Sequence, residues 1–259
     1  MTVYSQGIPL KKQFGQHFLR EQNVVDCAVN KVALDATSSV FEIGCGDGFL
    51  TRTILKKPIA RLWVFEIDLQ WIDYVKATIK DDRLTLKHEN ILDVDFSIFE
   101  PNKPWVLLAN LPYQITFPIL YMLHKNRDML QEAVIMIQEE VAQKLVKTRG
   151  RGYGFPSLFF RHFFEIELLQ KVAPTAFFPP PKVYSRLVYL KPKKNVLPIE
   201  NEEGFWKFIK FCFSQPRRTL RNNLLSTHYD LGKIPEETLA LRSQQMNMDD
   251  FIKIWALLQ

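Results

Sequence analysis

An Asn-Leu-Pro-Tyr tetrapeptide directly follows the apolar run at residues 105–109. Its chemistry suits an exocyclic adenine amine, which is a weak nucleophile because its lone pair is delocalised into the ring. The side-chain oxygen of Asn110 and the backbone carbonyl of Leu111 can accept hydrogen bonds from both amine hydrogens, with Pro112 fixing the turn. Tyr113 can stack on an extracted base. The tetrapeptide therefore predicts transfer of a methyl group to an adenine N6 amine, rather than an inert turn at the end of a strand.

A second group of residues predicts the methyl donor. The turn Gly-Cys-Gly-Asp-Gly begins at Gly44, where glycines let a ligand approach the backbone closely. Glu66 follows 22 residues after Gly44, at the end of the next strand, where it can accept hydrogen bonds from ribose hydroxyls. The spacing differs from the Gly-x-Gly-x-x-Gly of dinucleotide sites, and Asp47 would repel a pyrophosphate but not a cationic sulfonium. The loop favours S-adenosyl-L-methionine (SAM) over NAD.

These residues must be positioned by alternating strands and helices. Hydrophobic periodicity predicts strands at 39–43, 61–67, 83–88, 105–109, 133–137 and 186–192, and helices at 21–34, 49–56, 69–80, 115–124 and 138–147. Such alternation is typical of an α/β fold of the Rossmann-like SAM-dependent methyltransferase type, in which a mostly parallel sheet has helices on both faces. From about residue 202 onward the pattern is helical. We expect a catalytic domain of residues 1–192 and a small all-helical domain of residues 193–259.

The pattern is less regular after Gly150. We interpret RGYGFP as a loop, and PTAFFPPPKV as too rich in proline for a helix or a strand. The aromatic run at 159–164 is expected to belong to a hydrophobic core rather than to a platform for a nucleic-acid base.

Composition excludes several classes of protein. The chain has 259 residues, 47% hydrophobic and 24% charged, with no apolar run of about 20 residues and no signal-peptide pattern. Cys27, Cys45 and Cys212 are too widely spaced for a disulfide framework or a metal-ligand pair. We expect a cytoplasmic protein with no membrane partner and no metal site.

Positive charge is concentrated in one stretch. Residues 144–194 contain eleven basic and two acidic residues, a net +9, whereas the whole chain carries +6. Aromatic side chains are interleaved with these bases. This combination is expected for nucleic-acid binding, although a solvated basic face over an aromatic core would give the same composition.

Taken together, the motifs resemble those of the KsgA-type small-subunit (16S) rRNA adenine dimethyltransferases, relatives of the Erm resistance methyltransferases. The resemblance covers nearly the whole chain, through FGQHFL at 14–19, FEIGCGDG at 41–48, NLPY, and AFFPPPKVYS at 176–185. It implies that Phe177 stacks on the face of the adenine opposite Tyr113. It also implies a set of cofactor-binding residues: Gln16, His17, Leu19, Gly44, Gly46, Glu66, Asn90 and Asn110.

The resemblance further implies SAM-dependent N6,N6-dimethylation of two adjacent adenosines in the terminal hairpin loop of small-subunit rRNA, within a ribosome assembly intermediate. Segments 138–145 and 215–224 match the KsgA branch better than the Erm branch. We expect a monomer. The residues expected to contact RNA are Arg149, Arg151, Lys182, Arg217, Arg218 and Arg221.

Three residues depart from the family pattern. Asn90 stands where the family has an Asp that binds the SAM adenine, and Asp93 is the alternative ligand. Pro156 replaces part of a Leu-Ser pair, and Pro216 replaces an Arg. The intact tetrapeptide argues against a non-catalytic assembly factor, and the proline motif argues against an Erm-type enzyme.

Overall fold

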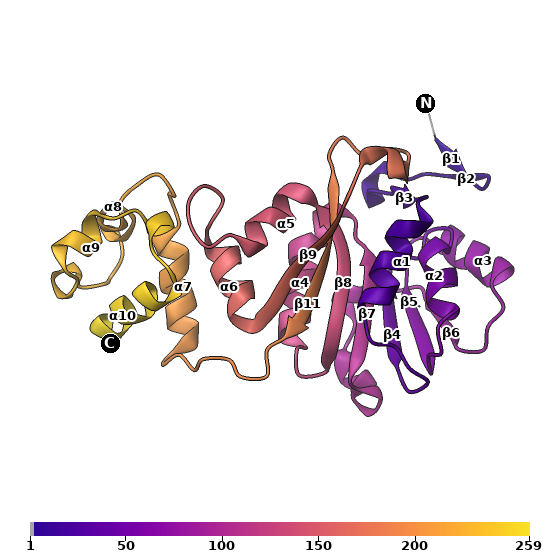
Figure 1. The fold of residues 1–259 in the computed structure, drawn as a ribbon, viewed down its shortest axis with the longest axis horizontal. Coiled ribbons are helices and arrows are strands. Elements are labelled where there is room, and N and C mark those ends of the chain that lie inside the picture. Colours follow the sequence, from indigo (N-terminus) through magenta and orange to yellow (C-terminus); the bar gives the residue numbers. More distant parts are fainter. Residues whose placement is uncertain (1–2) are drawn as a thin grey trace. The chain divides into compact units, whose positions relative to one another are not determined.

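The computed structural model describes residues 3–259, and its centre is a seven-stranded sheet (Figure 1). The strand order is β6-β5-β4-β7-β8-β11-β9. Neighbours from β6 to β8 pair in parallel, and β11 is antiparallel to β8. The strands are β4 (Ser39–Ile43), β5 (Arg61–Phe65), β6 (Leu84–Lys87), β7 (Trp105–Asn110), β8 (Leu130–Gln138), β9 (Phe164–Val172) and β11 (Ser185–Pro192). The predicted mostly parallel α/β sheet is confirmed.

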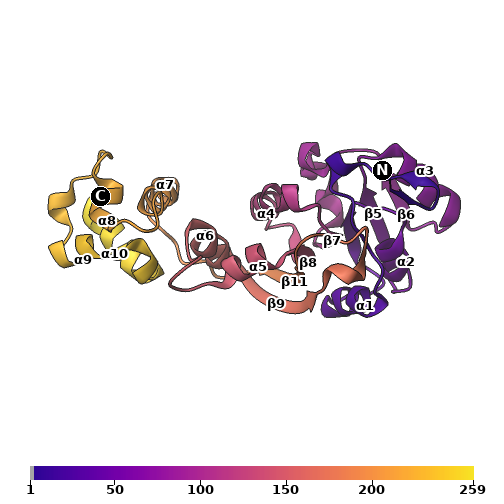
Figure 2. The same cartoon turned by 90° about the horizontal axis from the view of Figure 1, so that it is seen from above.

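Helices cover both faces of this sheet, with α4 on one side and α1 and α2 on the other (Figure 2). These elements are α1 (Gln22–Lys31), α2 (Phe49–Leu55), α3 (Leu69–Thr78), α4 (Thr116–Lys125) and α5 (Glu139–Val146). Two small antiparallel pairs flank the sheet: β1 (Tyr4–Ser5) with β2 (Ile8–Pro9), and β3 (Phe18–Leu19) with β10 (Phe177–Phe178). No helix within residues 3–259 is long and apolar enough to span a membrane.

The central strand β4 is buried on both faces, as expected for a parallel strand covered by helices. On one face Phe41 packs against Phe99 and Trp105, with ring centroids 4.8 Å apart in each pair. On the other face Val40 belongs to an aliphatic core with residues of α1 and α2, including Val25 and Ile54. These two layers hold the carboxyl ends of β4, β5 and β7 in fixed positions.

The chain forms two compact units. The first contains Met1–Ala142 and Glu165–Pro192, and the second contains Gln143–Phe164 and Lys193–Gln259. The second unit includes α6 (Phe155–Phe163), α7 (Glu202–Cys212), α8 (Leu220–Leu224), α9 (Glu236–Ala240) and α10 (Met248–Leu258). The predicted boundary after residue 192 recurs here, but segment 143–164, which we expected in the catalytic domain, groups with the helical unit.

Several elements were missed in the sequence. One is β10 (Phe177–Phe178), which lies in the segment PTAFFPPPKV that we considered too rich in proline for a strand. Its two residues precede the run of prolines and pair with β3. The first turn of α6 contains Phe155 and Pro156, which we interpreted as loop, and a proline is tolerated there because the first helical N–H groups need no partner within the helix. Its buried Phe159 lies 4.9 Å from Trp206 of α7, centroid to centroid, so the aromatic run is core, as predicted. Strand β9 was missed because its alternation of apolar and acidic residues, which favours a strand, is short and ends at Glu167, where Leu168 and Leu169 interrupt it.

Candidate active site

A cavity of about 250 Å³ lies at the carboxyl ends of β4, β5 and β7, where ligands bind in open α/β sheets. Every residue that we predicted to bind the cofactor or to act in catalysis lines it: Gln16, His17, Leu19, Gly44, Gly46, Glu66, Asn90, Asn110, Leu111, Pro112, Tyr113 and Phe177. Residues far apart in the chain are thus brought to one site.

The glycine loop is shaped for close packing. Gly44 and Gly46 have φ angles of +74° and +51°, in the left-handed region that side chains disfavour. A Cβ atom on Gly46 would lie 2.8 Å from the Phe18 ring. Phe18 is itself buried and meets Trp71 edge-on, with ring centroids 4.8 Å apart. Any other residue at position 46 would therefore strain the backbone and force the Phe18 ring to move.

The carboxylate of Glu66 is held by backbone donors. Its Oε1 accepts from the N–H of Asp68 at 2.9 Å, and its Oε2 accepts from the N–H of Gly46 at 3.4 Å. Glu66 is 7% exposed, and this burial raises its pKa above the ordinary value. Each oxygen keeps acceptor capacity, so the group can receive the hydroxyls of a ribose.

The amide of Asn110 has a fixed orientation. Its Nδ2 donates to the carbonyl oxygen of His17 at 3.0 Å, and no donor among residues 3–259 reaches its Oδ1. The His17 Nδ1 lies 2.7 Å from the Pro179 carbonyl, so that nitrogen carries the proton and donates. Asn110 therefore presents an acceptor at the end of β7, as the amine chemistry requires.

Two aromatic residues line the same cavity. Tyr113, in the 3₁₀ helix η4 (Tyr113–Ile115), shares a 2.8 Å hydrogen bond with the hydroxyl of the buried Ser185. Burial raises the pKa of the Tyr113 phenol, so the hydroxyl stays neutral. Phe177 is buried in β10, opposite Leu19 of β3. Both rings are thus available to a flat ligand that enters the cavity.

The two residues predicted as alternative ligands of the cofactor adenine differ in position. Asn90 lines the cavity and Asp93 does not. The Nδ2 of Asn90 donates to Asp93 Oδ2 at 3.0 Å, and its Oδ1 caps the 3₁₀ helix η2 (Ile91–Asp93) by accepting from Leu92 N at 3.2 Å. Asp93 thus acts by orienting Asn90.

One argument from the sequence was wrong. We expected the charge of Asp47 to exclude a pyrophosphate, but its carboxylate forms a 2.8 Å ion pair with Arg20. Because that charge is compensated, Asp47 does not discriminate between the two cofactors. The preference for SAM depends instead on the loop spacing, on Glu66 and on Asn110.

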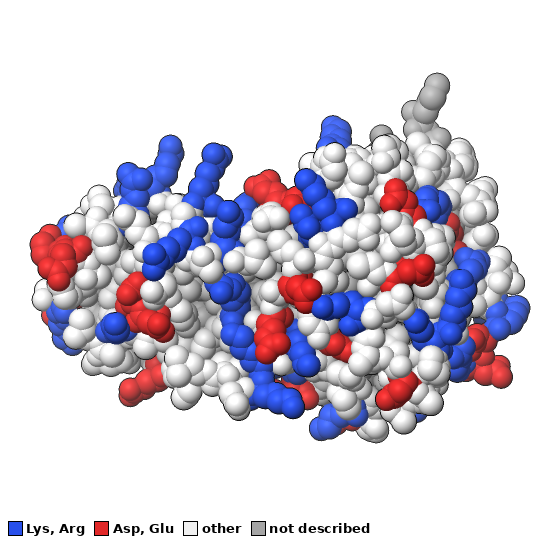
Figure 3. All heavy atoms as spheres, in the orientation of Figure 1, with Lys and Arg blue, Asp and Glu red and all other residues white. Residues whose placement is uncertain are grey.

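The basic residues expected to contact RNA lie outside the cavity. Lys182 is an exposed residue of the first unit, and the others belong to the helical unit: Arg149, Arg151, Arg217, Arg218 and Arg221. All are exposed except Arg221, which is paired with Glu236. Figure 3 shows basic side chains projecting from the upper side of the helical unit. The six residues remain the predicted RNA contacts.

The roles of three residues at the site were not predicted from the sequence. Phe18 packs on the glycine loop, Ser185 fixes Tyr113, and Asp68 binds residues of the N-terminal segment. Phe18 and Ser185 lie in the matched motifs at 14–19 and 176–185, and Asp68 carried a local signal because an Asp directly before a helix is a common cap. The partners of all three lie far away in the chain, so spacing could not reveal their contacts.

Comparison with known proteins shows the family to which this chain belongs. A family model described as ribosomal RNA adenine dimethylase matches residues 8–253. The ribosomal RNA small subunit methyltransferase A of Mycoplasma mobile is 39% identical over 225 residues, covering 86% of each chain. The protein of the same name from Chlorobium phaeobacteroides is 34% identical, over 96% of this chain and 91% of its own.

Solved structures agree on the fold. A dimethyladenosine transferase from Plasmodium falciparum superposes with a TM-score of 0.78 at 23% identity, covering 92% of this chain and 96% of that chain. The 23S rRNA methyltransferase ErmE gives 0.73 at 20% identity, covering 93% and 99%.

Proposed function

Since the chain belongs to the ribosomal RNA adenine dimethylase family, we propose that it transfers methyl groups from SAM to the N6 amine of adenosines in small-subunit rRNA. The observation that carries the proposal is Asn110, whose amide is fixed by His17 so that its Oδ1 faces a cavity also lined by Glu66. The relatives' name specifies the small subunit.

The cavity residues fit SAM. Glu66 offers acceptors to the ribose, Asn90 lies where the adenine amine would be bound, and the glycine loop leaves room beside the strand ends. When bound, SAM supplies an electrophilic methyl group. The remaining chemistry falls to residues of this chain.

Those residues position the amine rather than deprotonate it. The Asn110 Oδ1 and the Leu111 carbonyl accept from the two N6 hydrogens, which favours a tetrahedral nitrogen with its lone pair aimed at the methyl group. Tyr113, tethered by Ser185, and Phe177 hold the base between their rings. No strong base is needed because the N6 proton becomes acidic after transfer. Catalysis then comes from orientation and fixed dipoles.

We further propose the substrate, the oligomeric state and the RNA contacts that the motifs imply. The substrate is a pair of adjacent adenosines in the terminal hairpin loop, each receiving two methyl groups, on a ribosome assembly intermediate in the cytoplasm. The protein acts as a monomer. Exposed basic residues of the helical unit, among them Arg217 and Arg218, bind the phosphates of the rRNA.

The test is transfer of tritiated SAM to undermethylated small subunits, with large subunits and duplex DNA as controls. We expect label on small-subunit rRNA only, recovered as N6,N6-dimethyladenosine, and none with Asn110→Ala. Label confined to large-subunit rRNA would identify an Erm-type activity instead. Absence of transfer together with tight binding to small subunits would indicate an assembly factor.

A further inference from the structure

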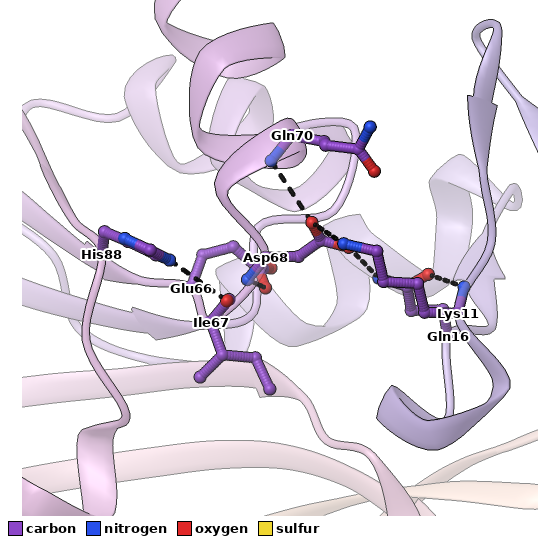
Figure 4. A network of polar contacts seen from close by, with 7 residues as sticks. All are labelled: Lys11, Gln16, Glu66, Ile67, Asp68, Gln70 and His88. Atoms are coloured by element: carbon purple, nitrogen blue, oxygen red, sulfur yellow. Dashed lines mark hydrogen bonds and ion pairs between the residues drawn. The ribbon is translucent and has the colours of Figure 1, made fainter.

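Residues 11–20 are here called the N-terminal strap; its residues 14–19 line one side of the cavity, and the strap contacts three other parts of the site. The His17 carbonyl accepts from Asn110, β3 pairs with β10, and Arg20 pairs with Asp47 of the glycine loop. The strap is therefore part of the site, although it precedes the sheet in the chain. What holds its first residues in place is a polar network centred on Asp68 (Figure 4).

The Asp68 carboxylate is fully buried and receives three donors. Its Oδ1 accepts from the Lys11 ammonium at 2.7 Å and from Gln70 N, at the start of α3, at 3.2 Å. Its Oδ2 accepts from Gln16 Nε2 at 3.1 Å. The other end of Gln16 is also engaged, since its Oε1 accepts from Lys11 N at 2.8 Å. A buried carboxylate with charged and neutral donors makes strong hydrogen bonds.

Asp68 also binds the residue predicted to hold the ribose. Its backbone N–H donates to Glu66 Oε1 at 2.9 Å, and only Ile67 lies between the two acids. The Ile67 carbonyl is 3.2 Å from His88 Nε2. The loop that carries Glu66 and the anchor of the strap are therefore one rigid turn.

We propose that Asp68 is a positioning residue that latches the N-terminal strap over the cofactor site and thereby sets the affinity for SAM and its demethylated product. The inference rests on the proposed function, because it assumes that the cavity binds SAM. Gln16 acts within this latch, since both ends of its amide are occupied by protein. Loss of the latch loosens the start of the strap, from Lys11 to Gln16. His17 and β3 stay held by the Pro179 carbonyl and by β10, so the Asn110 amide keeps its partner.

A pair of reciprocal substitutions tests the latch. Asp68→Asn places an amide donor against the Gln16 amide donor, and Gln16→Glu places two carboxylates face to face. The double variant restores one donor and one acceptor and returns a carboxylate to the reach of Lys11. Asp95→Asn is the matched control, because Asp95 caps a 3₁₀ helix through Ser97 N at 3.0 Å and does not touch the strap.

Two measurements are made on the full chain: hydrogen exchange of residues 11–20 without ligand, and S-adenosylhomocysteine affinity by calorimetry. We expect each single variant to speed exchange of the strap and to weaken affinity by about tenfold, with the KM for SAM raised and kcat within about twofold. The double variant should regain exchange protection, and Asp95→Asn should match wild type.

Unchanged exchange and affinity in Asp68→Asn would overturn the latch. A fall in kcat with unchanged KM would also overturn it, because the residue would then act on the chemistry. Wild-type protein that binds no S-adenosylhomocysteine would instead refute the proposed function, and the exchange data would still decide whether Asp68 holds the strap.

Discussion

Asn110 and Asn90 line the same cavity, but the protein uses different atoms of their side-chain amides. The Nδ2 of Asn110 donates to the His17 carbonyl, and its Oδ1 stays available as an acceptor. In Asn90, by contrast, Oδ1 already accepts from the N–H of Leu92 in η2, and Nδ2 donates to Asp93. Two side chains of the same type are therefore expected to have different roles, because their hydrogen-bond partners within the protein differ.

This difference predicts separable kinetic effects. Asn110→Ala should lower kcat by roughly 10²–10³-fold, because the transition state then lacks one acceptor for the amine. Asn90→Ala should weaken SAM binding by about tenfold and leave kcat nearly unchanged. Calorimetry with S-adenosylhomocysteine and steady-state assays would separate the two effects. An equal loss of cofactor affinity in both variants would contradict this division.

Glu42 is a buried acid outside the cavity lining, in the middle of β4. Its Oε2 accepts from the Thr51 hydroxyl at 2.8 Å, and its Oε1 has no partner among the described residues. Burial, with a contribution from the charge of Glu66, raises its pKa from 4.5 to about 8. Below pH 4.5 the group is protonated in both the folded and the unfolded chain. Between pH 4.5 and about 8 the unfolded chain ionises first, so stability falls as pH rises.

Glu42→Gln should remove this pH dependence. We expect the variant to gain on the order of a few kcal/mol over wild type at pH 9 and little at pH 5, measured by urea unfolding at both values. Glu203→Gln is a control with no pH dependence over this range, because Lys207 lowers the pKa of that exposed carboxyl below 4.5 and the group is ionised in both states at pH 5 and at pH 9. An equal stability change of Glu42→Gln at both pH values would show that the acid is ionised in the fold.

At the scale of elements, the glycine loop must fit between β4, α2 and the strap. Gly46 and Gly150 both have positive φ angles, of +51° and +75°. A Cβ atom would meet Phe18 at 2.8 Å in the first case and nothing within 4 Å in the second. The two glycines therefore separate the effect of backbone conformation from the effect of close packing.

Gly46→Ala and Gly150→Ala should each lose about 1 kcal/mol from the unfavourable backbone conformation. Only Gly46→Ala should also weaken S-adenosylhomocysteine binding, because Phe18 must move and cannot do so freely beside Trp71. Thermal unfolding and calorimetry on both variants check this. Equal affinity in the two variants would mean that the ring adjusts without disturbing the site.

Most elements of the first unit were predictable, because their strands are continuous apolar runs separated by polar turns. Helix α6 and strand β9 were not. The helix begins next to Gly154 and a proline, which usually mark a loop, and the alternating pattern of the strand is interrupted by Leu168 and Leu169. Burial of Phe159 and Phe163 stabilises the helix beyond its local preference.

At the scale of the whole molecule, the chain divides the work between two compact units. The cavity is built entirely from residues of the first unit, whereas most of the basic residues expected to contact RNA belong to the second. Affinity for rRNA and affinity for SAM should therefore respond to different substitutions.

Replacing Arg217 and Arg218 by alanine should weaken binding to small subunits. The slope of log affinity against log salt should fall by about 1 for each phosphate that the variant no longer neutralises. Affinity for S-adenosylhomocysteine should not change. Lys253→Ala is a control from an exposed position on α10. Filter binding at several salt concentrations gives the slope, and an unchanged slope would place the RNA surface elsewhere.

The sequence by itself determined the α/β fold of the first unit, the glycine loop, Glu66 and the Asn-Leu-Pro-Tyr tetrapeptide. Each of these features produces a recognisable local sequence pattern, because a strand end, a tight turn or a fixed dihedral requires particular residue types at fixed spacing. The tertiary structure alone decided that Arg20 neutralises Asp47, that Glu42 is buried, and that Asp68 binds Lys11 across 57 residues. The charge and orientation of such groups depend on partners brought near only by folding, and no local pattern records them.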